Sequence, residues 1–81
     1  MKNEIIKMYS EGYTSLEIMR DLDVDIDNVA SLILNNTQLK QEHEENLSKR
    51  CKGYISQGYT ENAISKILML PLNSVKKLLN M

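Results

Sequence analysis

The chain has 81 residues, of which 42% are hydrophobic and 26% are charged. This apolar content is enough to bury a core and is not typical of a disordered chain, and the length permits one small domain or two very small units that share a core. The single cysteine excludes an internal disulfide, and no apolar run approaches the ~18 residues that a membrane-spanning helix needs. We therefore expect a soluble, cytoplasmic protein without a signal peptide and without a membrane partner.

The net charge of −1 hides an uneven distribution along the chain. Residues 1–40 hold seven acidic and four basic side chains, and residues 41–48 add three glutamates. Residues 49–81 hold six basic side chains and one acidic one. The N-terminal part of the chain is therefore acidic and the C-terminal part is basic, and we expect the two parts to bind different partners.

An internal repeat organises the sequence. The segment SEGYT at Ser10–Thr14 returns as SQGYT at Ser56–Thr60, and at this offset of 46 the ungapped comparison of 5–35 with 51–81 has eight identical pairs in 31. Apolar positions match in both copies, and we expect the pairs Ile18 with Ile64, Leu22 with Leu68 and Val29 with Val75 to be buried. The chain is therefore predicted to be a duplicated unit, with a pair of units and not a longer array.

The first copy is predicted to form three helices. Apolar residues at helical spacing end at Gly12, which can adopt the left-handed conformation that terminates a helix. Thr14 and Glu17 form the pattern of a capping box at the start of a second helix. The segment Asp23-Val24-Asp25 breaks this helix, and Asp25 is expected to cap a third one.

The second copy repeats this pattern after a helical connector. Between the copies, Leu39, His43, Leu47, Cys51 and Tyr54 recur every three or four positions without an intervening proline, which predicts one long helix over 37–57. Gly58 then ends that helix, Thr60 caps the next one, and a turn over 69–71 precedes the last. We expect unit one at 1–36, a helical connector at 37–48 and unit two at 49–81, in an all-α fold with a long shared helix and one core shared by the two units.

Both copies resemble the helix-turn-helix family, whose pattern is roughly Gly-Tyr-Thr-x-x-Glu-Ile-Ala, then x-x-Leu-Gly-Val-Ser, then x-x-Thr-Val-x-x-x-Leu. The segments GYTSLEIMRDLDVDIDNVASLI and GYTENAISKILMLPLNSVKKLL carry the resemblance, although Asp23 and Met69 stand at the turn glycine. The chain looks like the three-helical domains of resolvases, of the fourth region of sigma factors, and of small regulators from phages and mobile elements. The resemblance implies tandem helix-turn-helix units and a transcription regulator that binds duplex DNA, either as a monomer or as a homodimer.

In such a domain the third helix enters the major groove, so the basic unit two is the expected reader of DNA. Its outward positions would be Asn73, Ser74, Lys76, Lys77 and Asn80, with backbone phosphates held by Lys66, Lys52, Arg50 and Lys49. The same residues on a protein without a nucleic-acid partner would be a solvated lysine-rich face.

Unit one presents carboxylates where phosphates would lie, so it is not expected to bind DNA. Its candidate protein-binding residues are Asp23, Asp25, Asp27 and Ile26. Ile26 matches Leu72, and both are either core residues or a small exposed contact for a partner. The alternatives to a DNA-binding regulator are a modulator that binds a polymerase, repressor or other DNA-associated machine through unit one, and a phage DNA-packaging or architectural subunit.

No catalytic constellation is apparent, and we expect neither enzymatic activity nor a cofactor. His43 has no second histidine or nearby cysteine that could complete a zinc site, and we expect it on a solvated helix face. Cys51 matches Ile5 and is expected to be a buried apolar group. Tyr13 and Tyr59 are expected to pack at the helix junctions with their hydroxyls in water.

Overall fold

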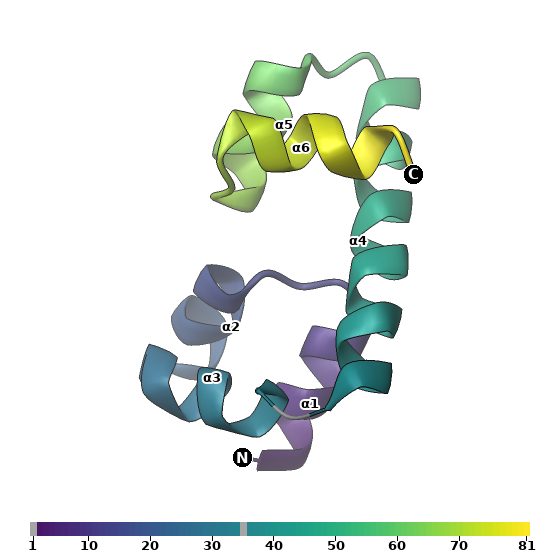
Figure 1. Ribbon diagram of the computed structural model, residues 1–81. Helices are drawn as coiled ribbons and strands as arrows, with labels where there is room; N and C mark the ends of the chain where they lie inside the picture. Colours follow the sequence, from purple (N-terminus) through teal and green to yellow (C-terminus); the bar gives the residue numbers. More distant parts are fainter. Residues whose placement is uncertain (1, 35) are drawn as a thin grey trace.

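The computed structural model describes residues 2–34 and 36–81, except the side chains of Lys2 and Ile26. Every regular element within these residues is an α-helix (Figure 1): α1 (Lys2–Ser10), α2 (Ser15–Leu22), α3 (Ile26–Ile33), α4 (Thr37–Ser56), α5 (Glu61–Leu68) and α6 (Leu72–Leu79). The all-α prediction is thereby confirmed. None of the described helices combines the length and the apolar character needed to cross a membrane.

The long helix α4 runs beside both halves of the chain (Figure 1), with α1, α2 and α3 at one end and α5 and α6 at the other. It begins at Thr37 as predicted and ends at Ser56, one residue before the predicted end. The Asn36 side chain accepts a hydrogen bond from the Leu39 amide and caps its start. From here on, unit one is α1–α3, and unit two is the C-terminal half of α4 with α5 and α6.

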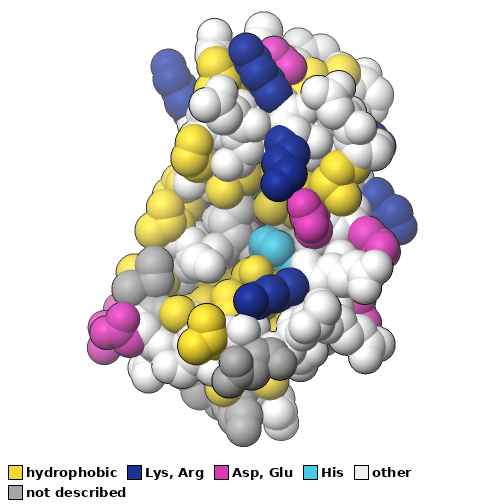
Figure 2. Space-filling view, viewed as in Figure 1, with side chains coloured by type: hydrophobic (Ala, Val, Ile, Leu, Met, Phe, Trp, Pro, Cys, Tyr) yellow, Lys and Arg dark blue, Asp and Glu magenta, His cyan; other side chains and the backbone are white. Residues whose placement is uncertain are grey.

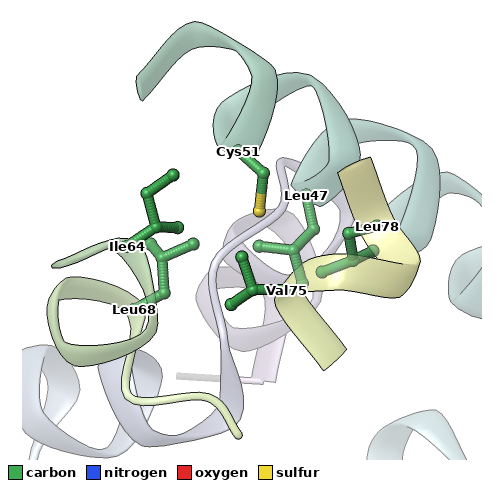
Figure 3. Packing of buried hydrophobic residues seen from close by; sticks show 6 residues of the cluster. All are labelled: Leu47, Cys51, Ile64, Leu68, Val75 and Leu78. Atoms are coloured by element: carbon green, nitrogen blue, oxygen red, sulfur yellow. The ribbon is translucent and has the colours of Figure 1, made fainter. Parts of the chain in front are cut away.

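Two separate apolar clusters form the core, so the expectation of one shared core is wrong. The first consists of Ile5, Tyr9, Ile18, Val29 and Leu39. The second, drawn in Figure 3, joins α4, α5 and α6 through Leu47, Cys51, Ile64, Leu68, Val75 and Leu78. Because α4 contributes Leu39 to one cluster and Leu47 and Cys51 to the other, the units share a helix and not a core.

The matched apolar positions of the repeat are mostly buried. Ile18 and Ile64 are both fully buried, as are Val29 and Val75, so these predictions are confirmed. Leu68 is also fully buried, but its match Leu22 is half-buried, so the expectation that both are buried is wrong for Leu22. The matched positions at the centre of each unit are therefore buried in both copies, whereas the pair Leu22 and Leu68 differs in burial.

The predicted helix boundaries hold, with one difference in how they are capped. Thr14 and Glu17 form both hydrogen bonds of the capping box, and the Thr60 hydroxyl accepts from the Ala63 amide. Asp25 occupies the N-cap position of α3, but its side chain makes no capping hydrogen bond, contrary to expectation. The two turns that precede α3 and α6 each begin in the left-handed region, at Asp23 (φ 52°) and Met69 (φ 56°).

Candidate nucleic-acid interface

One face of α6 carries polar and basic side chains. Asn73, Lys76, Lys77 and Asn80 are all exposed, and their spacing of i, i+3, i+4 and i+7 aligns them along the helix. Val75 and Leu78, on the opposite side, are buried against α4 and α5. The burial of one stripe thus fixes which side chains of α6 point to solvent.

The lysines predicted to hold phosphates are spread over the other helices of unit two. Lys66 is exposed in the last turn of α5, and Lys49 is exposed on α4. Lys52 is also exposed, but its ammonium group donates a hydrogen bond to the backbone oxygen of Met81. These three positions leave their charges accessible to solvent at different places on the unit.

Arg50 differs from these lysines, because its guanidinium group is held within the molecule. It forms a bidentate ion pair with Glu17, with N–O distances of 2.8 and 3.1 Å, and donates to the Gly12 carbonyl at 2.9 Å. Its carbon Cζ also lies 4.9 Å from the centre of the Tyr13 ring, in cation–π geometry. A group with this many internal partners is not presented to a phosphate, so the structure places Arg50 outside the exposed basic set.

The ion pair ties α4 to the capping box of α2. Burial alone raises the pKa of Glu17, but hydrogen bonds from Arg50 and Thr14 and the charge of Arg50 outweigh burial and hold that pKa below its ordinary value. The hydrogen bond and charge of Glu17 in turn raise the pKa of Arg50. The contact therefore keeps both groups charged and fixes unit one against the middle of α4.

A groove of about 330 Å³ lies between the two units, on the side of α4 that α6 approaches. Lys40 and Ser74 line it together with Lys77, over a floor that includes Leu47 and Leu70. Figure 2 shows the single histidine in this hollow, with basic side chains above and below it and an acidic side chain beside it, and Glu44 is among the residues that line the groove. Ser74 is half-buried here, so it faces the groove and not the open surface of α6.

His43 is not on a solvated helix face, which corrects the sequence expectation. Its ring stacks on Tyr9 with centroids 3.7 Å apart and planes 4° from parallel, and Nδ1 lies 2.8 Å from the Tyr9 carbonyl oxygen. Because a carbonyl oxygen only accepts, Nδ1 carries the proton. Burial lowers the pKa of His43, and this burial outweighs the opposing effects of the hydrogen bond that His43 donates to the Tyr9 carbonyl and of the charge of Glu44.

Unit one presents a different surface at the matching positions. Asp23, Asp25 and Asp27 are all exposed around the start of α3. The face of α3 that corresponds to the polar face of α6 holds Asp27, Ala30, Ser31 and Leu34, without a cation. The prediction for Ile26 falls on a side chain outside the described part of the structure, whereas its match Leu72 is half-buried.

The cysteine and the two tyrosines that the sequence singled out each contact other side chains of the protein. Cys51 is fully buried in the second cluster, as expected, and burial raises the pKa of its thiol. Tyr13 lies under Arg50, and Tyr59 contacts Tyr54 edge to face. In the described ranges, no group of three or more His, Cys, Asp or Glu side chains is placed to hold a metal ion.

Comparison of the chain with protein-family models, with curated proteins and with solved structures gave no match. Sequence reasoning did not place Lys40 on the same groove as Lys77, because Lys40 lies in the N-terminal half of α4 and Lys77 on α6, and only the fold brings both to the groove. It also missed the partner of Arg50, although the capping-box glutamate at Glu17, absent from the second copy, was a visible signal.

Proposed function

We propose that the protein is a small transcription regulator built from two tandem helix-turn-helix units, and that unit two binds duplex DNA. In this proposal α6 lies in the major groove, and its face of Asn73, Lys76, Lys77 and Asn80 meets the bases and the adjoining phosphates. The observation that carries the proposal is that these four exposed side chains share one helical face and include no acid.

Further basic groups surround this face. Lys66 is exposed on α5, and Lys40 lies across the groove from α6, so phosphates on either side of the reading helix would meet a cation. The start of α6 adds to this, because no side chain makes a capping hydrogen bond to its first turn. Free amides at a helix N-terminus attract anions.

The contrast between the units supports the same assignment. The matching helix of unit one begins among Asp23, Asp25 and Asp27, and these exposed carboxylates repel the phosphate backbone. A duplicated unit that presents cations in one copy and carboxylates in the other has two different uses. We assign DNA to the basic copy alone.

The test is the salt dependence of binding to duplex DNA. Each lysine that neutralises a phosphate contributes about 0.9 to the slope of log affinity against log salt, so replacing Lys76 and Lys77 with glutamine should reduce the slope by up to ~2. Binding to every DNA sequence should weaken. A double variant with Lys7→Gln and Arg20→Gln has the same change in charge on unit one and should bind as the native protein does. Equal losses in both double variants would show a non-specific effect of charge and contradict the proposal.

A second candidate function is the binding of a protein partner by unit one. It is favoured by the cluster of Asp23, Asp25 and Asp27 and by Leu34, which is 64% exposed at the end of α3. Asp25→Asn combined with Asp27→Asn should leave DNA affinity unchanged or raise it, because these carboxylates only repel phosphate. If this variant abolishes activity in cells while Lys76→Gln with Lys77→Gln has no effect, the acidic surface of unit one is the functional surface.

A further inference from the structure

The groove between the units has two helical walls. Four residues of α4, spaced i, i+3, i+4 and i+7, share one side of that helix and form the first wall: Lys40, His43, Glu44 and Leu47. Three residues of α6, spaced i, i+3 and i+4, form the other: Ser74, Lys77 and Leu78. Each wall therefore brings one lysine and one leucine to the same hollow.

The polar groups that would bind an anion in this groove have no partner among the described residues. The ammonium groups of Lys40 and Lys77 form no hydrogen bond or ion pair there, in contrast to the paired Arg50 on the same long helix. The hydroxyl of Ser74 likewise forms no hydrogen bond with a described residue, although Ser74 is half-buried. Two cations and one hydroxyl donor thus converge on the groove with their binding capacity unused.

The groove is positive overall, and part of its lining is apolar. Among its described lining residues, two lysines stand against the one carboxylate of Glu44. His43 is neutral at neutral pH, because burial lowers its pKa below the ordinary value of 6.5. Leu47, Leu70 and Leu78 add aliphatic carbon, and Leu70 is only half-buried. Such a site favours a ligand that has both an anionic group and an apolar body.

The size of the groove points to a small molecule. Its volume of about 330 Å³ lies near the lower end of the range for sites that bind small ligands. Figure 2 shows the hollow open to solvent, with basic side chains above and below the histidine. An inorganic anion would use the lysines and leave the leucines in water, whereas a neutral apolar molecule would leave the lysines without a counter-ion.

We propose that the groove binds a small phosphate monoester, with its phosphate held by Lys40, Lys77 and Ser74 and its apolar body against Leu47 and Leu70. A phosphate monoester carries close to two negative charges above its second pKa of ~6, which matches two lysines. Its oxygens accept hydrogen bonds from ammonium groups and from a serine hydroxyl. The flexible lysine stems allow both cations to approach one phosphate. The inference does not depend on DNA binding.

The test is a titration of the full chain, without DNA, with phenyl phosphate at about pH 7.5, where the phosphate is a dianion. In amide NMR spectra the shifts should saturate and should be concentrated on the residues that line the groove. Inorganic phosphate and phenol each carry one part of this probe, and each should bind at least ~tenfold more weakly, because the charge and the ring are both recognised. Equal affinities for inorganic phosphate and phenyl phosphate would overturn the proposal.

Two adjacent lysines of α6 provide a matched pair of variants. Lys77 lines the groove, whereas the exposed Lys76 is not part of its lining. Lys77→Gln and Lys40→Gln should each raise the dissociation constant of phenyl phosphate at least ~threefold, because each removes a charge-assisted contact. Lys76→Gln makes the same change in net charge and should leave the constant unchanged. Equal effects of Lys76→Gln and Lys77→Gln would indicate attraction by the charge of unit two as a whole and contradict the proposed site.

The histidine gives a measurement on the native protein. His43 is the single histidine of the chain, so its ring protons give isolated NMR signals. Its ring lines the groove and stacks on Tyr9, so a phenyl ring bound in the groove should shift these signals. The shifts should yield the same dissociation constant as the amide signals. Histidine signals that stay in place when the amide shifts saturate would locate the probe elsewhere and refute the proposal.

Discussion

Arg50, in the second half of α4, and Glu17, in the first turn of α2, form a bidentate ion pair that joins the long helix to unit one. Glu17 is buried and also accepts the Thr14 amide, so one carboxylate completes a helix cap and binds a distant helix. The repeat has no equivalent, because Ala63 stands at the matching position in unit two.

Removing Arg50 should therefore destabilise the protein. Arg50→Ala leaves a buried carboxylate without its cation, which should reduce the free energy of unfolding by ~2–4 kcal/mol. The control is Arg20→Ala, which removes an ion pair with Asp21 that is largely exposed and should cost less than ~1 kcal/mol. Urea unfolding followed by circular dichroism measures both, and equal effects would show that the buried pair has no special role.

Acidification should reduce stability in two steps. The pKa of His43 is lowered in the folded state, so between that pKa and the ordinary value of 6.5 the unfolded chain binds more protons, and stability falls as the pH falls through this window. The pKa of Glu17 is also lowered, so its contribution is complete above its ordinary value of 4.5 and is lost as the pH falls below it. Urea unfolding at a series of pH values should show the first step disappear in His43→Gln and the second in Glu17→Gln.

The three glycines should respond differently to replacement by alanine. Gly53 lies inside α4 with open space around it, so Gly53→Ala should stabilise by about 0.5–1 kcal/mol. Gly58 has a φ of 98°, so Gly58→Ala should destabilise by ~1–2 kcal/mol through backbone strain alone. Gly12 has the same φ and also touches the backbone of α4, so Gly12→Ala should be the most destabilising. Thermal unfolding of the three variants should reproduce this order, and equal losses for Gly12 and Gly58 would contradict the close approach of α4.

The backbone of the turn before α6 is strained at one residue, and a substitution there should relieve the strain. Met69 has a φ of 56°, in the left-handed region, where asparagine and aspartate are better tolerated than methionine. Met69→Asn should therefore stabilise the protein by ~0.5–1 kcal/mol, while Met69→Leu, which retains the strain, should not. A lower melting temperature for Met69→Asn would show that contacts of the methionine side chain outweigh the strain.

The groove gives a separate prediction about DNA. If Lys40 meets a phosphate beside α6, Lys40→Gln should reduce the salt slope of binding by about 0.9. Lys7→Gln, at an exposed position of α1, should leave the slope unchanged. DNA binding with the native slope in Lys40→Gln would restrict the interface to unit two.

The helices, their boundaries and most of the buried residues could be predicted from the sequence. Apolar spacing, the Thr14 and Thr60 caps and the glycines at positions 12 and 58 act over a single helical turn, so they are readable in a linear pattern. The internal repeat shows this pattern of apolar spacing, caps and glycines twice, and the fully buried Ile18 and Ile64 occupy matched positions in it.

The packing of the units on α4 was decided only by the tertiary structure. Arg50 was interpreted as a phosphate ligand and His43 as a solvated side chain, and both instead contact unit one across more than thirty residues of sequence. A charged side chain has the same local pattern whether it faces water or a buried carboxylate, so its partner depends on which elements meet in space. The same holds for Tyr9 and Ile55, which share a position in the repeat and differ in exposure because α4 covers one of them and not the other.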